Sequence, residues 1–142
     1  MPIKVKKITL WRKELENRPG TLAEALDPVA KAGTDLQVVM GYCYPGDRTK
    51  AAVELFPVAS KKTTAAAQAA GFGPAGVSAL HVEGDNRVGL GSAIARALAD
   101  AGVNLVFLMA QVIGRKYSAM IGFENDADAA KAIPLIKKAT KK

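Results

Sequence analysis

The sequence predicts an α+β protein, a two-layer α/β sandwich built from two copies of one small module. Three observations lead to this fold class. Similar residues return in one register after 69 positions of the 142-residue chain, which indicates an internal duplication. Each copy contains segments of strand periodicity and segments of helix periodicity. Clusters of glycine, proline and asparagine separate these segments, as turns require.

The duplication is clearest in two short segments. Asn17-Arg18-Pro19-Gly20-Thr21-Leu22 corresponds to Asn86-Arg87-Val88-Gly89-Leu90-Gly91 at the offset of 69. The same offset relates further pairs: Gly33 and Gly102, Asp35 and Asn104, Leu36 and Leu105, Val38 and Phe107, and Met40 and Met109. We therefore divide the chain into module 1, residues 1–74, and module 2, residues 75–142.

Module 1 opens with a strand around Ile8 and Leu10, followed by turn residues 17–20. The run Thr21-Leu22-Ala23-Glu24 fits a capping box, which predicts a helix start. One helical face carries apolar residues, namely Leu22, Leu26, Val29 and Ala30. Gly33 is placed to end the helix, and Pro28 predicts a kink or a restart within it.

The second half of module 1 predicts a hairpin and another helix. Residues 36–42 alternate in polarity, Pro45-Gly46-Asp47 is a turn sequence, and residues 49–56 form the returning strand. Residues 60–70 are rich in alanine and predict a helix that Gly71 ends. Gly73-Pro74 then leads into an extended run over residues 75–83.

Module 2 repeats this order. We expect a helix over residues 90–101, strands over 104–113 and 117–123, and a last helix capped near Asp126. An order of strand, helix, strand, strand, helix, strand with antiparallel neighbours is the ferredoxin-like βαββαβ arrangement. Both helices then cover one face of a four-stranded sheet, and the two sheets would lie side by side.

One strand of module 2 is missing from its own segment. After its last helix only Thr140, Lys141 and Lys142 remain, which is too short for a fourth strand. Ile3 and Val5 alternate with Lys4 and Lys6, as in a strand with one wet face. By the logic of the duplication, residues 2–7 complete the sheet of module 2, and the two modules interlock.

The composition excludes several classes of function. With one cysteine, Cys43, and one histidine, His81, the chain offers no disulfide framework, zinc cluster or Cys/His nucleophile pair. The net charge is +7, but only 6% of residues are aromatic and much of the charge lies at the chain ends. A nucleic-acid surface is therefore not expected. No apolar run could span a membrane, so we expect a soluble cytoplasmic protein.

The two duplicated loops resemble a known family. The segment from Glu16 to Leu22, followed by Ala32-Gly33-Thr34-Asp35-Leu36, resembles ACT domains, in particular the regulatory domain of phosphoglycerate dehydrogenases. Asn86 to Gly91 and Ala101-Gly102-Val103-Asn104-Leu105 carry the second copy. The resemblance implies a tandem ACT-domain regulatory protein that binds a free amino acid at domain interfaces and relays its presence to an enzyme.

The resemblance also implies ligand-binding residues. In module 2 these are Asn86, Arg87, Val88, Gly89, Leu90 and Asn104; in module 1 they are Asn17, Arg18, Gly20, Thr21 and Asp35. The family's loop has a histidine two residues before its first asparagine, where this chain has Leu15 and Gly84. Both loops therefore depart from the serine-binding pattern.

Physical chemistry supports module 2 as the preferred site. A glycine at a helix start leaves N–H groups free to hold a carboxylate, and Asn86 with Asn104 could hold the carboxylate and ammonium of one zwitterion together. The alternative is that the asparagines only shape turns. The glycines of residues 84–92 lack the ending of a phosphate-binding P-loop.

The sequence thus predicts an allosteric amino-acid-binding protein that acts through a partner metabolic enzyme or as a homodimer. A second hypothesis is a ligand-free interaction module that uses its open sheet face. An enzyme is not expected, because no convergent ionisable groups are visible. No cofactor or metal is predicted.

Overall fold

The computed structural model describes residues 2–141. The backbone divides into two compact units, residues 9–76 and residues 2–8 together with 77–141, for which the names module 1 and module 2 are kept. None of the helices in the described part of the chain is long and apolar enough to cross a membrane.

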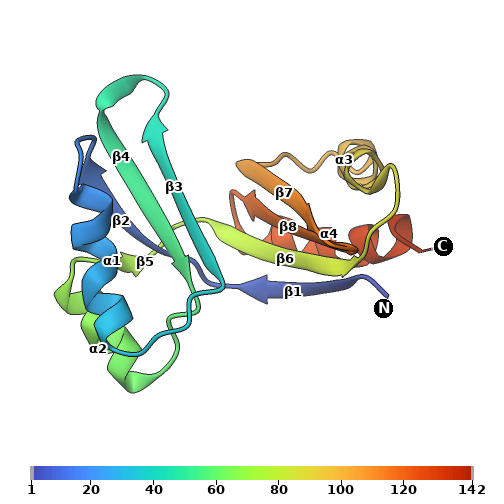
Figure 1. Ribbon diagram of the computed structural model, residues 1–142. Helices are drawn as coiled ribbons and strands as arrows, with labels where there is room; N and C mark the ends of the chain where they lie inside the picture. Colours follow the sequence, from blue (N-terminus) through green and yellow to red (C-terminus); the bar gives the residue numbers. More distant parts are fainter. Residues whose placement is uncertain (1, 142) are drawn as a thin grey trace. The chain divides into compact units, whose positions relative to one another are not determined.

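Module 1 contains four strands and two helices in the predicted order (Figure 1). Its elements are β2 (Trp11–Glu16), α1 (Thr21–Lys31), β3 (Val38–Tyr44), β4 (Asp47–Phe56), α2 (Lys61–Ala69) and β5 (Gly73–Pro74). The sheet has the antiparallel order β3-β4-β2-β5. The fourth strand is only two residues long, and the Ala75 N–H after it still donates to the Leu10 carbonyl at 2.8 Å. The strand precedes the extended run predicted from residue 75 onward.

The buried face of α1 agrees with the predicted one at Val29 and Leu26 but not at its other two residues. Thr21, Ala25 and Val29 are buried, whereas Leu22 is 43% exposed and Ala30 is also exposed. The capping box was wrong as well: the N-cap is Gly20, and the Thr21 hydroxyl donates to the carbonyl oxygens of Glu16 and Arg18. The helix therefore begins at Thr21, one residue earlier than a capping box with Thr21 as the N-cap predicts.

Pro28 does not divide α1 into two helices. The structure assigns residues 21–31 to one continuous helix with Pro28 inside it. The helix ends as predicted, with Gly33 in the left-handed region at φ 82°, and the Gly33 N–H donates to the Ala30 carbonyl.

Module 2 is built from two distant parts of the sequence. Its elements are β1 (Lys4–Ile8), β6 (Ser78–Asp85), α3 (Leu90–Asp100), β7 (Phe107–Ile113), β8 (Lys116–Phe123) and α4 (Asp126–Ala139). The sheet order is β1-β6-β8-β7, all antiparallel. The N-cap of α4 is Asn125 instead of Asp126. Taken alone, each module has the predicted ferredoxin-like arrangement.

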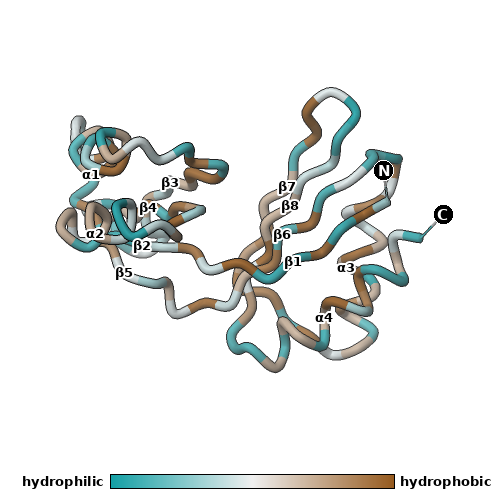
Figure 2. The backbone as a smooth tube through the Cα atoms, turned by 90° about the horizontal axis from the view of Figure 1, so that it is seen from below, coloured by the Kyte–Doolittle hydropathy of each residue, from teal (hydrophilic) through white to brown (hydrophobic). Residues whose placement is uncertain are grey.

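Strand β1 takes the edge position next to β6. Val5 lies opposite Val82 and packs on the core of the module together with Ile3. Lysines separate the hydrophobic residues along β1 (Figure 2). Gly84 permits a close approach at the start of this strand, because a Cβ there would lie 2.8 Å from the Ile3 Cα.

Helices α3 and α4 bury the core of module 2 against its sheet. The largest completely buried side chains include Ile94 and Leu98 from α3, Ile136 from α4, and Leu80, Ile121 and Phe123 from the sheet. This core fixes the β6–α3 loop, which carries the preferred candidate site.

Candidate functional site

The β6–α3 loop of module 2 begins at Asn86 and leads into α3 through Gly89. Gly89 is the N-cap of α3 and has φ 89°, a left-handed conformation that glycine adopts without a steric penalty. No side chain caps the helix, and its first turn contains no acidic residue. The N–H groups of this turn therefore offer a partial positive charge that no neighbouring carboxylate of the helix neutralises.

The loop side chains differ in exposure. Asn86 and Val88 are exposed, Arg87 is half-buried and Leu90 is buried. The Asn86 backbone N–H donates to the Arg115 carbonyl at 2.8 Å, which anchors the loop on the β7–β8 turn. Arg87 donates to the Lys141 carbonyl at 3.3 Å. The Asn86 side chain is thus presented to solvent from a fixed backbone.

Asn104 lies at the opposite end of the module 2 sheet. Asn86 follows Asp85, which lies opposite Lys116 at the start of β8. Asn104 precedes Phe107, which lies opposite Gly122 near the end of β8. A strand rises about 3.3 Å per residue, so the length of β8 separates the two asparagines by roughly 20 Å. The expectation that both hold one zwitterion within a single module was therefore wrong.

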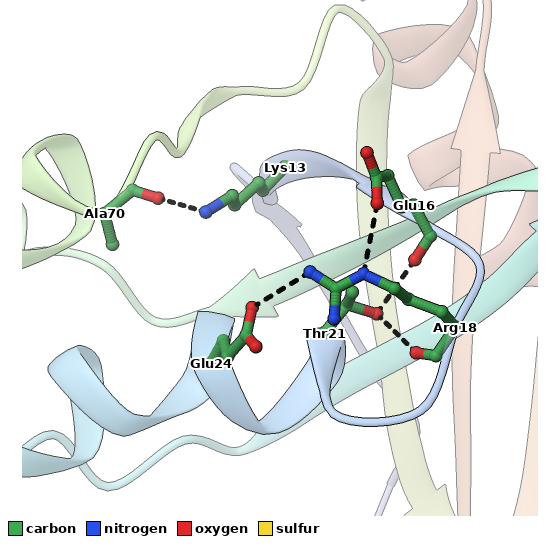
Figure 3. Close-up of polar contacts among 6 residues, drawn as sticks. All are labelled: Lys13, Glu16, Arg18, Thr21, Glu24 and Ala70. Atoms are coloured by element: carbon green, nitrogen blue, oxygen red, sulfur yellow. Dashed lines mark hydrogen bonds and ion pairs between the residues drawn. The ribbon is translucent and has the colours of Figure 1, made fainter.

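In the corresponding loop of module 1, the cation of Arg18 is already paired with carboxylates of the same module (Figure 3). The Arg18 guanidinium contacts Glu16 at 3.1 Å and Glu24 at 3.7 Å. The hydrogen bond to Glu16, followed by the charge of Glu24, raises the pKa of Arg18. Gly20 caps α1 with φ 94°, as Gly89 caps α3, but Glu24 already lies in the first helical turn.

The other predicted residues of module 1 have structural partners or lie elsewhere. The Asn17 side chain donates to the Arg48 carbonyl at 2.7 Å, which agrees with a role in shaping the turn. The Thr21 hydroxyl is buried and donates to loop carbonyls. Asp35 follows α1, at the end of the module opposite to Asn17, and is exposed. Module 2 is therefore the better candidate for binding an anionic group.

Sequence reasoning missed a polar network on the helix-free sheet face of module 1. The Tyr42 hydroxyl donates to Glu54 at 2.8 Å and the Tyr44 hydroxyl donates to Glu14 at 2.9 Å. Arg12 donates to the Tyr44 hydroxyl and lies over its ring. Residues 12 and 14 of β2 lie on the same face of the sheet as residues 42 and 44 of β3. The alternation of side chains along each strand could therefore have predicted that they lie on one face.

A cavity of about 490 Å³ in module 2 was also missed. It lies between the start of β1, the β6–α3 loop and the end of α4. Its lining residues are Pro2, Ile3, Asp85, Arg87, Leu90, Lys137, Thr140 and Lys141. No local sequence signal could have found it, because three distant segments form it.

The remaining singled-out residues form no reactive cluster. His81 shares a hydrogen bond of 3.2 Å with the Ser118 hydroxyl, and Cys43 is exposed with a free thiol. Among residues 2–141, no group of three or more histidine, cysteine, aspartate or glutamate side chains is arranged to hold a metal ion.

Several solved structures share this fold. A protein from Bacteroides thetaiotaomicron has a TM-score of 0.73 at 15% identity, over 92% of this chain and 88% of that chain. The ligand-free regulatory subunit of aspartate kinase from Thermus thermophilus has a TM-score of 0.64 at 14% identity, over 99% and 98%. The aspartate kinase of Clostridium acetobutylicum, an allosteric enzyme, gives 0.57 at 14%, over 98% of this chain and 34% of the kinase.

Neither a protein-family model nor a curated protein sequence matches the chain. At these identities the structural matches establish the fold alone. The chain has the tandem fold of aspartate kinase regulatory subunits, in agreement with the predicted resemblance to ACT domains.

Proposed function

We propose that this chain is a cytoplasmic, non-enzymatic regulatory protein that binds a free amino acid at the β6–α3 loop of module 2. Binding would act on a partner enzyme or on the chain's own association. The fold shared with an aspartate kinase regulatory subunit supports a regulatory role. The uncapped start of α3 supports an α-carboxylate as the group that is held.

The observation that carries the proposal is the separation of Asn86 from Asn104. A single module cannot place both asparagines on one amino acid. A second copy of the chain can supply the missing one, if it joins the sheet in the opposite direction. The ligand would then lie between two copies, with Asn86 from one protomer and Asn104 from its partner.

Strand β7 provides the edge for such an association. It is an edge strand of its sheet, and residues 105–113 contain no charged side chain. Its exposed apolar residues include Leu108 at 41%, Val112 at 49% and Ile113 at 67%. Natural edge strands are usually protected by charges or covered by a partner. Because the edge of β7 is apolar and uncharged, we expect a partner strand to cover it.

A two-fold axis perpendicular to the sheet and beside the middle of β7 gives the required geometry. The two β7 strands related by this axis are neighbours and run antiparallel, so the first half of each strand lies beside the second half of the other. The Asn104 end of one protomer then lies at the Asn86 end of the other. This association explains both the exposed apolar edge of β7 and the separation of Asn86 from Asn104 within one module.

The proposal is tested by a ligand screen combined with sedimentation. Thermal melting of the whole chain in the presence of each of the twenty amino acids should identify a stabilising ligand. A ligand at 100 times its dissociation constant stabilises by about 2.7 kcal/mol. The same ligand should increase the dimer fraction in sedimentation velocity.

A ligand-free interaction module remains the second candidate, because the β7 edge alone supports association. This candidate predicts a dimer whose stability no amino acid changes. A monomer that no amino acid stabilises would contradict both functions.

A further inference from the structure

A second candidate site lies in the cavity between β1, the β6–α3 loop and α4. The start of β1 and the end of α4 lie at the same end of module 2 (Figure 1). The cavity between them has a volume of about 490 Å³, within the range of small-molecule pockets, roughly 300–1,000 Å³. All of its lining residues belong to module 2.

The apolar part of the lining comes from Pro2, Ile3 and Leu90. Ile3 is half-buried and packs on the core of the module, and Leu90 is buried within that core. The apolar wall is therefore held by packed side chains. It can receive a short aliphatic group and remove it from water.

The polar part of the lining is positive. Arg87, Lys137 and Lys141 contribute three cations. Among the described lining residues, the carboxylate of Asp85 is paired with Lys116 at 2.8 Å, so its charge is already matched. A neighbouring hollow of about 410 Å³ shares Ile3 and Lys137, and its other charged residues are the lysines of residues 4 and 6 and one carboxylate, Glu83. The combination of charges favours an anion over a cation or a neutral molecule.

The cavity lies where the two modules differ in connectivity. In module 1, the chain runs from α2 directly into β5 through Gly71 and the buried Phe72. In module 2, α4 and β1 come from distant parts of the sequence, and the cavity lies beside the start of β1 and the end of α4. Arg87 reaches across to the Lys141 carbonyl at 3.3 Å and keeps other N–H donors for a ligand.

We propose that this cavity binds a small organic anion, a carboxylate attached to a short branched aliphatic chain. Arg87 and Lys137 hold the carboxylate, and Ile3 and Leu90 contact the aliphatic group. An occupant touches β1, the β6–α3 loop and α4 together, so its binding fastens the edge strand to the module. This site shares Arg87 and Leu90 with the predicted β6–α3 loop site, but it does not use Asn104, which lies at the other end of the sheet.

The test uses the whole chain and three carboxylates that share one aliphatic group: 3-methylbutanoate, 4-methyl-2-oxopentanoate and leucine. The uncharged 3-methylbutanamide is the matched control ligand. Isothermal titration should show saturable binding of at least one carboxylate and at least about tenfold weaker binding of the amide, since charge-assisted hydrogen bonds are the stronger ones. The carboxylate that binds should also slow amide hydrogen exchange in β1.

The variant is Lys137→Glu, and its matched control is Lys138→Glu. Lys138 is the next residue of the same helical turn, carries the same charge and does not line the cavity. Lys137→Glu should weaken binding by about tenfold or more, whereas Lys138→Glu should leave it within about twofold. If Lys137→Glu does not fold, as circular dichroism would show, Lys137→Gln replaces it with the same expected direction.

Three results overturn the proposal. The first is the absence of saturable binding for all three carboxylates. The second is equal affinity for the acid and its amide, which would leave the cations without a role. The third is equal weakening by the substitutions at residues 137 and 138. Binding lost in Asn104→Ala and retained in Lys137→Glu would assign the ligand to the loop site of the proposed function instead.

Discussion

Lys7 in β1 places its Nζ 2.9 Å from Oδ1 of Asp126 in the first turn of α4. The same carboxylate oxygen accepts a hydrogen bond from the Ser78 hydroxyl at the start of β6. Three segments that are distant in sequence thus meet at one carboxylate. Both contacts are exposed, so their contribution to stability is small, but they mark the register in which β1 completes the sheet of module 2.

Deletion of residues 2–7 should destabilise module 2, the half farther along the chain. The deletion uncovers the edge of β6 and removes Ile3 and Val5 from the core, which also promotes aggregation. Hydrogen exchange on the truncated protein measures this effect. Faster exchange is expected in residues 104–123, and protection equal to that of the whole chain would contradict the role of β1.

Gly84→Ala should weaken the pairing of the first residues of β1 with β6 and leave the pairing of the later residues of β1 intact. The added Cβ would lie 2.8 Å from the Ile3 Cα and 2.9 Å from the Pro2 carbonyl oxygen, so backbone must move. We expect a loss of about 1–3 kcal/mol of unfolding free energy and faster amide exchange in residues 3–5. Gly76→Ala, which has open space around its added Cβ, is the control. Unchanged stability and exchange in Gly84→Ala would contradict the close approach.

The ion pair of Asp85 with Lys116 should make stability depend on pH. The hydrogen bond from Lys116 lowers the pKa of Asp85 from 3.8 to about 2. Since the folded pKa is depressed, the stabilisation is present above the unfolded value and is lost as the pH falls through about 2. The unfolding midpoints of the wild type and Asp85→Asn in urea should differ near neutral pH and converge near pH 2. A constant difference over this range would contradict the assignment.

Val112→Lys should prevent association through β7. Val112 is 49% exposed on this edge strand, and a lysine there would place like charges in the joined sheet. We expect the dimer dissociation constant in sedimentation equilibrium to rise by about tenfold or more. Val39→Lys is the matched control, because Val39 is 46% exposed on the edge strand β3 of module 1. If both substitutions raised the dissociation constant equally, the association would not be specific to β7, and this prediction would be wrong.

The sequence predicted the elements of both modules because turn chemistry and periodicity are local signals. Gly33 and Gly71 end helices where expected, and the hairpin turn at Pro45 and Gly46 lies between β3 and β4. The start of α1 was missed because Thr21 fits a capping box as an N-cap, and only the φ of Gly20 decides. The exposure of Leu22 depends on how the helix packs on its sheet, which the local sequence does not record.

The candidate site was less predictable because it depends on direction and on distant contacts. A strand followed by a helix carries the chain back to the other end of the sheet, so Asn86 and Asn104 had to lie far apart in one module. The order and directions of the strands predict this separation, whereas matching of the motif alone does not. The exposure of β7 and the cavity beside Ile3 depend on sheet order and on residues from three segments, which no local pattern records.

The measurement that tests the central claim most directly is complementation between two binding-deficient variants. If each ligand contacts Asn86 of one protomer and Asn104 of its partner, Asn86→Ala and Asn104→Ala should each weaken amino-acid binding by roughly 1–3 kcal/mol. A mixture of the two variants forms heterodimers in which one site contains both asparagines. Isothermal titration of the mixture should therefore recover high-affinity binding at a fraction of the sites. A mixture that binds no more tightly than either variant alone would contradict a site shared between two copies.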